Sequence, residues 1–216
     1  MSLARLLQLA SPTLPVGAYS YSGGLEAAIE DGTVHDAASA QQWIGEVLEF
    51  SLARMEAPLL LAFMAACSSK DLSKLKELNE TFLASRESAE LRAETVQMGY
   101  SLNRLLADLG LGEVPVDEPS FPAAYAFAAE HWNVESEAAL QAYLWAWIEN
   151  QVMAALKAVP LGQTDGQRML LALGERIEGL VKRAAQTKDQ DMQNFAPGLA
   201  LRSSRHETQY SRLFRS

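Results

Sequence analysis

Serine and tyrosine hydroxyls gather in one glycine-rich loop, Gly17–Gly24 (GAYSYSGG), the first place where the sequence offers reactive groups. A loop of this kind ahead of a helix can cradle phosphate with its backbone N–H groups. The G-x-x-x-x-G-K-[ST] spacing and a nearby lysine are absent, which argues against a nucleotide pocket. Ser20 and Ser22 lie outside a G-x-S-x-G motif, so a hydrolase triad has no support either. The simpler interpretation is a helix connector that packs Tyr19 and Tyr21 on the core.

Metal binding would need ligands at helical or knuckle spacing. The histidines and the one cysteine are instead scattered along the chain, at His35, Cys67, His131 and His206. We interpret His35 and His131 as polar residues that flank helices. His206 with Glu207 could bind a metal weakly, but hydrogen bonding at an interface is the stronger expectation. The sequence therefore predicts no metal ligands and no tightly bound cofactor.

The last fifteen residues, Arg202–Ser216, carry four arginines and one glutamate, a charge of +3 on a chain of net charge −9. The rest keeps 14 basic and 26 acidic residues, a charge of −12. Tyr210, Leu213 and Phe214 are too few to build a core of their own. Arginine and aromatic side chains dominate binding energy at interfaces, so this tail should fold back on its domain or dock on a partner. We divide the chain into a domain, residues 1–201, and a flexible partner-binding tail, residues 202–216.

Length and composition fit one soluble domain. The 216 residues, 49% hydrophobic and 21% charged, can bury a sizeable core. A single cysteine excludes an internal disulfide and favours a reducing, cytoplasmic compartment. The apolar run Leu59–Cys67 has nine residues, too few to span a bilayer. The pI near 4.9 argues against nucleic-acid binding.

Helical periodicity runs through nearly the whole chain, and no alternating β-branched run predicts a strand. We expect an all-α, single helical-bundle-like domain of roughly eight to ten helices. The stretch from about Glu135 to Val159 is apolar on most faces and should lie centrally. Pro58 should kink a helix or start a new one. Thr164 and Gln167 have capping-box spacing for a helix that continues to about Ala185.

Two features of these elements leave alternatives open. The polar run Glu149–Gln151 interrupts the central helix. If buried, it forms a hydrogen-bonded network or a water-lined passage; if not, it marks the exposed strip of that helix, which is the interpretation we favour. Lys157, one turn before Pro160, either complements the helix dipole or presents a charge to a partner. The polar segment Gln186–Gly198 is expected to be mobile.

Three sequence blocks together carry a family resemblance. They are LLQLASPTLPVGAYSYSGGLE (Leu6–Glu26), AWIENQVMAALKAVPLGQ (Ala146–Gln163) and SSRHETQYSRLFRS (Ser203–Ser216). In these blocks the chain resembles urease accessory protein F (UreF), and the last block, which runs to the C-terminus, is the most specific. Ala18 departs from the family, which often has a second glycine there.

The resemblance implies an all-α, dimeric, non-enzymatic protein. It implies a scaffold that joins UreD (UreH in some organisms) to the GTPase UreG, modulates that GTPase, and so helps to insert nickel into apo-urease. Tyr19, Glu26 and Lys157 match positions on the face presented to UreG. The positions that match the UreD-binding tail motif are Arg205, His206, Glu207, Tyr210, Arg212 and Arg215.

Nickel that passes through such a subunit would use a water-filled passage with few strong ligands, because tight binding would oppose transfer. Two other classes of function stay open at this stage. One is a direct nickel-binding protein that uses His206 and neighbouring carboxylates. The other is a small all-α enzyme built on the Ser/Tyr loop.

Overall fold

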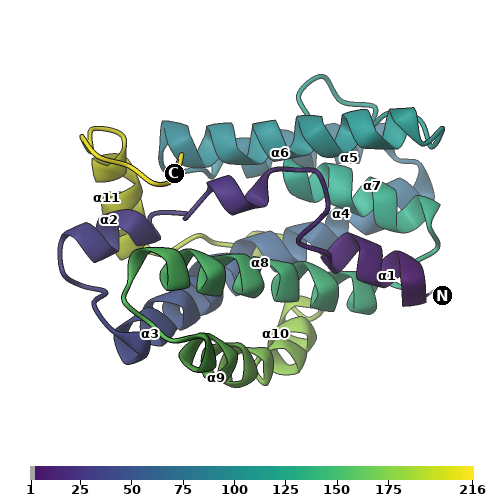
Figure 1. Ribbon diagram of the computed structural model, residues 1–216. Helices are drawn as coiled ribbons and strands as arrows, with labels where there is room; N and C mark the ends of the chain where they lie inside the picture. Colours follow the sequence, from purple (N-terminus) through teal and green to yellow (C-terminus); the bar gives the residue numbers. More distant parts are fainter. Residues whose placement is uncertain (1–2) are drawn as a thin grey trace.

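The computed structural model describes residues 3–216, and these form an all-α domain, as the sequence predicts (Figure 1). Helices α4, α7 and α8 pack together in the middle, α6 covers α7 on one side, and α9 and α10 pack on the other. The α-helices are α1 (Leu3–Ala10), α2 (Leu25–Glu30), α3 (Ala37–Val47), α4 (Ala57–Ser69), α5 (Leu72–Ala84), α6 (Ala89–Asp108), α7 (Phe121–His131), α8 (Ser136–Ala158), α9 (Gln163–Gly174), α10 (Ile177–Ala184) and α11 (Pro197–His206). Short 3-10 turns, η1 (Ala18–Ser20) and η3 (Asp189–Asp191), lie between them. The expected central helix is α8, with Glu135 as its N-cap.

One helix is much longer than its sequence signals suggest. A π-helical stretch, η2 (Leu48–Glu56), joins α3 to α4, so that residues 37–69 form a continuous helix of 33 residues. Its length and composition would suffice to cross a membrane, but 67% of its most apolar window is buried within the protein. It is therefore placed as a core helix.

Pro58 lies in the first turn of α4, which agrees with the expected new start, but the backbone enters α4 directly from the π-helix without a loop. A proline has no N–H to donate to the carbonyl four residues earlier. That carbonyl, of Arg54, instead accepts a hydrogen bond of 3.2 Å from the backbone N–H of Gln193. The neighbouring Phe195 N–H donates to the carbonyl of Phe50 at 3.3 Å. The segment that was expected to be mobile is thus paired with the π-helix by its backbone, which side-chain polarity does not reveal.

The start and the end of the predicted helix near residues 164–185 also differ from expectation. Gly162 is the N-cap of α9, and the Asp165 carboxylate accepts its backbone N–H at 3.2 Å, in place of the Thr164 capping box. The helix then ends at Gly174, and α10 begins at Ile177. Apolar periodicity alone does not show that Asp165 caps the helix from within its first turn. Nor does it show the break of two residues between Gly174 and Ile177.

The chain returns to its own N-terminal region at the end. Helix α11 packs on α2 and α6, and residues 207–216, which we call the C-terminal segment, cross α2 and the first turns of α6 (Figure 1). This is the first of the two arrangements expected for the tail. The boundary drawn at residue 202 falls within α11.

Candidate functional site

Glu26 on α2 is the centre of the contacts that hold the C-terminal segment. Its side chain is buried, and its Oε1 accepts the backbone N–H of Leu213 at 2.7 Å. Its Oε2 accepts the N–H of Phe214 at 3.0 Å and lies 3.1 Å from Nε2 of His206. The resemblance assigns Glu26 to a face for UreG, but in this arrangement it binds the chain's own tail.

His206 links the two helices beneath the segment. The ring is fully buried, and its Nδ1 lies 2.6 Å from Oε2 of Glu90 in the first turn of α6. The other oxygen of Glu90 accepts from the Arg212 guanidinium at 2.6 Å. The Arg212 guanidinium and the Glu90 carboxylate are therefore paired with each other. This pairing offsets part of the free-energy cost of removing them from water.

The end of the chain completes this contact on the Ser/Tyr loop. The Ser216 carbonyl accepts hydrogen bonds from the Ser22 hydroxyl and from the Ser22 backbone N–H, the latter at 2.9 Å. The Arg215 backbone N–H donates to the Ser20 carbonyl at 2.8 Å. Tyr21 is buried beside them, and burial raises the pKa of its phenol. The serines of this loop thus hold backbone, which explains their presence without invoking catalysis.

Tyr19 and Lys157 meet the C-terminal segment at its outer edge. The Lys157 ammonium lies 6.0 Å from the ring centroid of Tyr19 and 5.7 Å from that of Phe214, within the range of cation–π attraction. Tyr19 is 68% exposed, so the expectation that both loop tyrosines pack on the core is wrong for Tyr19 and confirmed for Tyr21. The Lys157 ammonium at the C-terminal end of α8 is thus flanked by two aromatic rings and stays exposed.

The remaining tail residues that the resemblance singled out point in different directions. Glu207 accepts the backbone N–H of Ala89 at 2.8 Å at the start of α6. Arg205 is exposed and only reaches 4.0 Å from Asp31, and Tyr210 makes no contact that shields it from solvent. The structure therefore brings Glu26, Lys157 and Tyr19 together with the tail, and leaves Arg205 and Tyr210 on the outside.

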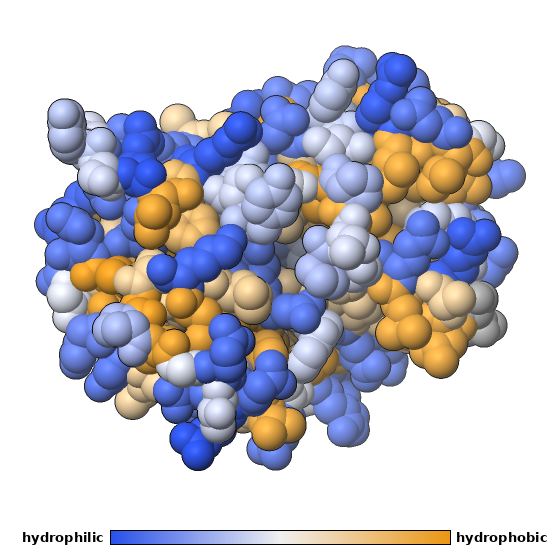
Figure 2. Space-filling view, viewed as in Figure 1, coloured by the Kyte–Doolittle hydropathy of each residue, from blue (hydrophilic) through white to orange (hydrophobic). Residues whose placement is uncertain are grey.

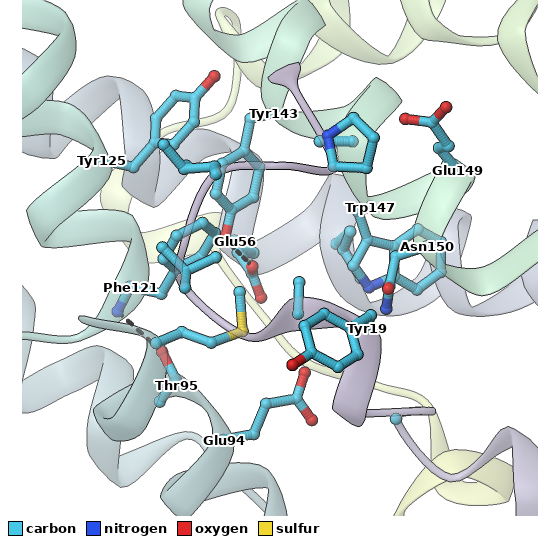
Figure 3. A pocket seen from close by; sticks show the side chains of 18 of the residues that line it. Tyr19, Glu56, Glu94, Thr95, Phe121, Tyr125, Tyr143, Trp147, Glu149 and Asn150 are labelled. Atoms are coloured by element: carbon cyan, nitrogen blue, oxygen red, sulfur yellow. Dashed lines mark hydrogen bonds between the residues drawn. The ribbon is translucent and has the colours of Figure 1, made fainter. Parts of the chain in front are cut away.

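A cavity of about 470 Å³ adjoins this contact and runs into the core (Figure 3). At its inner wall the Tyr143 hydroxyl donates to Oε1 of Glu56, the last residue of the π-helix. Oε2 of Glu56 accepts from the Arg86 guanidinium at 3.3 Å. Burial, together with the Glu56 charge, raises the pKa of Tyr143 well above its usual value, so this phenol stays a donor.

Glu94 connects the cavity to the C-terminal segment. Its carboxylate accepts from the Ser216 hydroxyl at 2.6 Å and faces the cavity below Tyr19 in Figure 3. Burial raises its pKa to about 7, so the group titrates near neutral pH. Sequence reasoning did not single out Glu90 or Glu94, although their spacing of four residues puts both on one face of α6.

The polar run of α8 has a mixed outcome. Gln151 is 4% exposed, and the Asn150 amide donates to the Tyr21 carbonyl at 3.1 Å. Glu149 is half-buried at the cavity, and burial raises its pKa. The favoured interpretation, an exposed strip, is wrong for Gln151, because this stretch supports the Ser/Tyr loop.

Among residues 3–216, no group of three or more histidine, cysteine, aspartate or glutamate side chains is arranged to hold a metal ion. Both ring nitrogens of His206 already contact carboxylates. Burial raises the pKa of the Cys67 thiol to about 11, which keeps it protonated and a poor ligand at neutral pH.

Comparison with known proteins identifies the family. The UreF family model matches residues 34–174. The chain is 59% identical over 225 residues to urease accessory protein UreF of Azoarcus sp. (strain BH72), covering 100% of this chain and 96% of the relative. It is 54% identical over 224 residues to urease accessory protein UreF of Dechloromonas aromatica (strain RCB), covering 100% and 98%. The chain therefore belongs to the UreF family of urease accessory proteins, which makes it an accessory protein and not an enzyme.

Proposed function

We propose that the protein is a cytoplasmic, dimeric scaffold that joins UreD (or UreH) to UreG in the GTP-dependent chaperone that inserts nickel into apo-urease, and that it modulates the UreG GTPase. The observation that carries this proposal is the convergence of two sets of residues. Lys157, expected on the face for UreG together with Tyr19, lies between the Tyr19 ring and Phe214 of the C-terminal segment, which is expected to bind UreD. A scaffold whose two binding regions adjoin can hold both partners at once.

The UreD-binding region would include the tail and the first helix. Leu213 is 71% exposed and Tyr210 fully exposed on the C-terminal segment. On α1, Leu3 and Leu7 are more than half exposed, and apolar surface gathers over the ends of α1 and α6 at the right of Figure 2. Exposed apolar and aromatic side chains next to arginines are typical of protein-binding surfaces.

The UreG-binding region would centre on Lys157. Its ammonium lies at the C-terminal end of α8 and is exposed beside the Tyr19 ring. Glu26 contributes indirectly, because it is buried beneath Leu213 and Phe214 and holds them in place. Nickel is cargo in this scheme, and the cavity lined by Glu56, Glu94 and Glu149 would be part of its path. Structures of the complex without a continuous cavity through this subunit would remove that path.

The first experiment removes residues 207–216, which leaves every described helix intact. Helix content measured by circular dichroism should stay nearly unchanged, while pull-down of UreD and urease activation should be lost. A truncated chain that does not fold would show instead that the segment belongs to the core. Size-exclusion chromatography with light scattering of the full chain tests the dimer.

The second experiment reverses one charge. Lys157→Glu should keep UreD binding and weaken UreG recruitment, because a like charge at an interface costs more than a lost contact. Lys76→Glu makes the same charge change on an exposed position of α5 and should leave both interactions intact. Equal UreG binding by the two variants at moderate salt would exclude Lys157 from the interface.

A further inference from the structure

The ring of His206 is buried between α2 and α6. Its two ring nitrogens lie beside two different carboxylates, 2.6 Å from Glu90 and 3.1 Å from Glu26. A neutral imidazole offers one donor and one acceptor nitrogen, whereas an ionised carboxylate only accepts. With a neutral ring, one of the two nitrogens would therefore have no hydrogen to donate, and its lone pair would face a carboxylate oxygen. Both bonds form only when the ring carries a hydrogen on each nitrogen.

The carboxylates are not the source of that hydrogen. Glu26 also accepts the backbone N–H groups of Leu213 and Phe214, at 2.7 and 3.0 Å. Glu90 accepts the Arg212 guanidinium at 2.6 Å. Donors of this kind stabilise the ionised form of a carboxylate. Each glutamate is thus held as an acceptor by a donor other than the histidine, and the ring must supply both hydrogens.

We propose that His206 docks as an imidazolium, so that the joint binding of His206 and the C-terminal segment to α2 and α6 takes up a proton and weakens as the pH rises. With the ring charged, the two positive charges of His206 and Arg212 balance the two negative charges of Glu26 and Glu90. With the ring neutral, one buried negative charge is left without a partner, which is strongly unfavourable. The other charged groups around α11 lie at its edges: Asp31 beside Arg202 and Arg205, Glu207 at the start of α6, and Glu94 one turn after Glu90.

The direction of the pH effect follows from proton linkage. A free histidine ring loses its second hydrogen around pH 6.5, so above that pH docking must bind a proton from solution. One proton corresponds to at most a tenfold loss of the docking constant per pH unit. Glu94 also titrates in this range, because burial raises its pKa to about 7, so its contribution has to be separated from that of the ring. This inference concerns the isolated chain and stands whether or not the proposed partners are correct.

Amide hydrogen exchange at Leu213 and Phe214 tests it, since both N–H groups donate to Glu26. After correction for intrinsic exchange, their protection in the full chain should fall between about pH 6.5 and 8.5, by up to tenfold per unit. His206→Gln should lower the protection and remove the slope attributed to the ring. His206→Lys, which stays charged over this range, should keep a flat and higher protection. Glu94→Gln as a common background removes the second titrating group.

The control is His35→Gln, because His35 is exposed and distant in sequence from the segment. It should reproduce the slope of the parent chain. A slope that persists in His206→Gln, or protection that does not change with pH in the parent, would overturn the proposal.

A second measurement needs no substitution. The ¹⁵N resonances of the His206 ring in the unmodified chain, at about pH 7.5 where a free ring is neutral, report whether each nitrogen bears a hydrogen. Two protonated nitrogens while the Leu213 and Phe214 amides are protected would support the imidazolium. One unprotonated nitrogen under the same conditions would refute it.

Discussion

The protein buries charged side chains in two places that differ in what they join. At the inner wall of the cavity, Glu56 and Arg86 connect the π-helix to the end of α5, amid the packed core. Beneath the C-terminal segment, Glu26 and Glu90 bind a stretch in which Phe214 is the one buried apolar side chain. The buried ion pair of Glu56 is therefore surrounded by extensive apolar packing, whereas the contacts of Glu26 and Glu90 with the segment are surrounded by little. The first should act as a part of the folded core, and the second as a reversible attachment.

The largest effect is expected from Glu56→Ala. The substitution leaves the Arg86 guanidinium, with 9% of its side chain exposed, and the Tyr143 hydroxyl without their acceptor. Removing one partner of a buried pair costs about 3 to 5 kcal/mol of the free energy of unfolding. Urea denaturation monitored by circular dichroism measures this loss. Glu178→Ala, which removes an exposed pair with Lys182, is the control and should change little.

The second effect should be confined to the C-terminal segment. Glu26→Ala removes the acceptor of two backbone N–H groups and one of the two carboxylates beside His206. Amide protection at Leu213 and Phe214 should fall at least tenfold, since hydrogen bonds to charged groups contribute about 1.5 to 3 kcal/mol. The urea midpoint of the body should stay close to that of the parent chain. If Glu26→Ala unfolds the body as readily as Glu56→Ala, the contact beneath the C-terminal segment is part of the core and not a reversible attachment.

The sequence predicted the all-α class and the central helix because these depend on local periodicity and caps. It also indicated that residues 202–216 need a binding surface, because a charge of +3 with few apolar groups cannot form a core. It did not indicate that this surface is Glu26 and Glu90, which are 64 residues apart in the sequence. Such pairings depend on tertiary packing, in which helices far apart along the chain become neighbours. The direct continuation of η2 into α4 was not predicted for the same reason, since a distant backbone N–H satisfies the Arg54 carbonyl.

The third effect depends on pH and concerns Glu94, which lines the cavity and also accepts a hydrogen bond from the C-terminal segment. The Glu94 carboxyl has an ordinary pKa of 4.5, raised to about 7 in the folded protein. The folded state thus holds its proton more tightly, so this group's contribution is present below pH 4.5 and is lost as the pH rises through about 7. Glu94→Gln keeps an acceptor for Ser216 and should raise stability at pH 8 by roughly 1 to 3 kcal/mol relative to the parent. Thermal unfolding at pH 5 and pH 8 measures it, and an equal shift at both pH values would contradict the assignment.

The smallest effect should come from Lys157→Met, and it separates two roles that the structure places side by side. The cation–π contacts of Lys157 with Tyr19 and Phe214 are exposed and long, at 6.0 and 5.7 Å, and contribute about 0.5 to 1 kcal/mol. Amide protection of Phe214 should therefore fall only about two- to fivefold, less than in Glu26→Ala. If UreG recruitment falls much further than docking does, Lys157 contacts that partner directly. If recruitment instead falls in proportion to docking across Glu26→Ala and Lys157→Met, the lysine acts by holding the C-terminal segment in place, and the region that binds UreG is the segment itself.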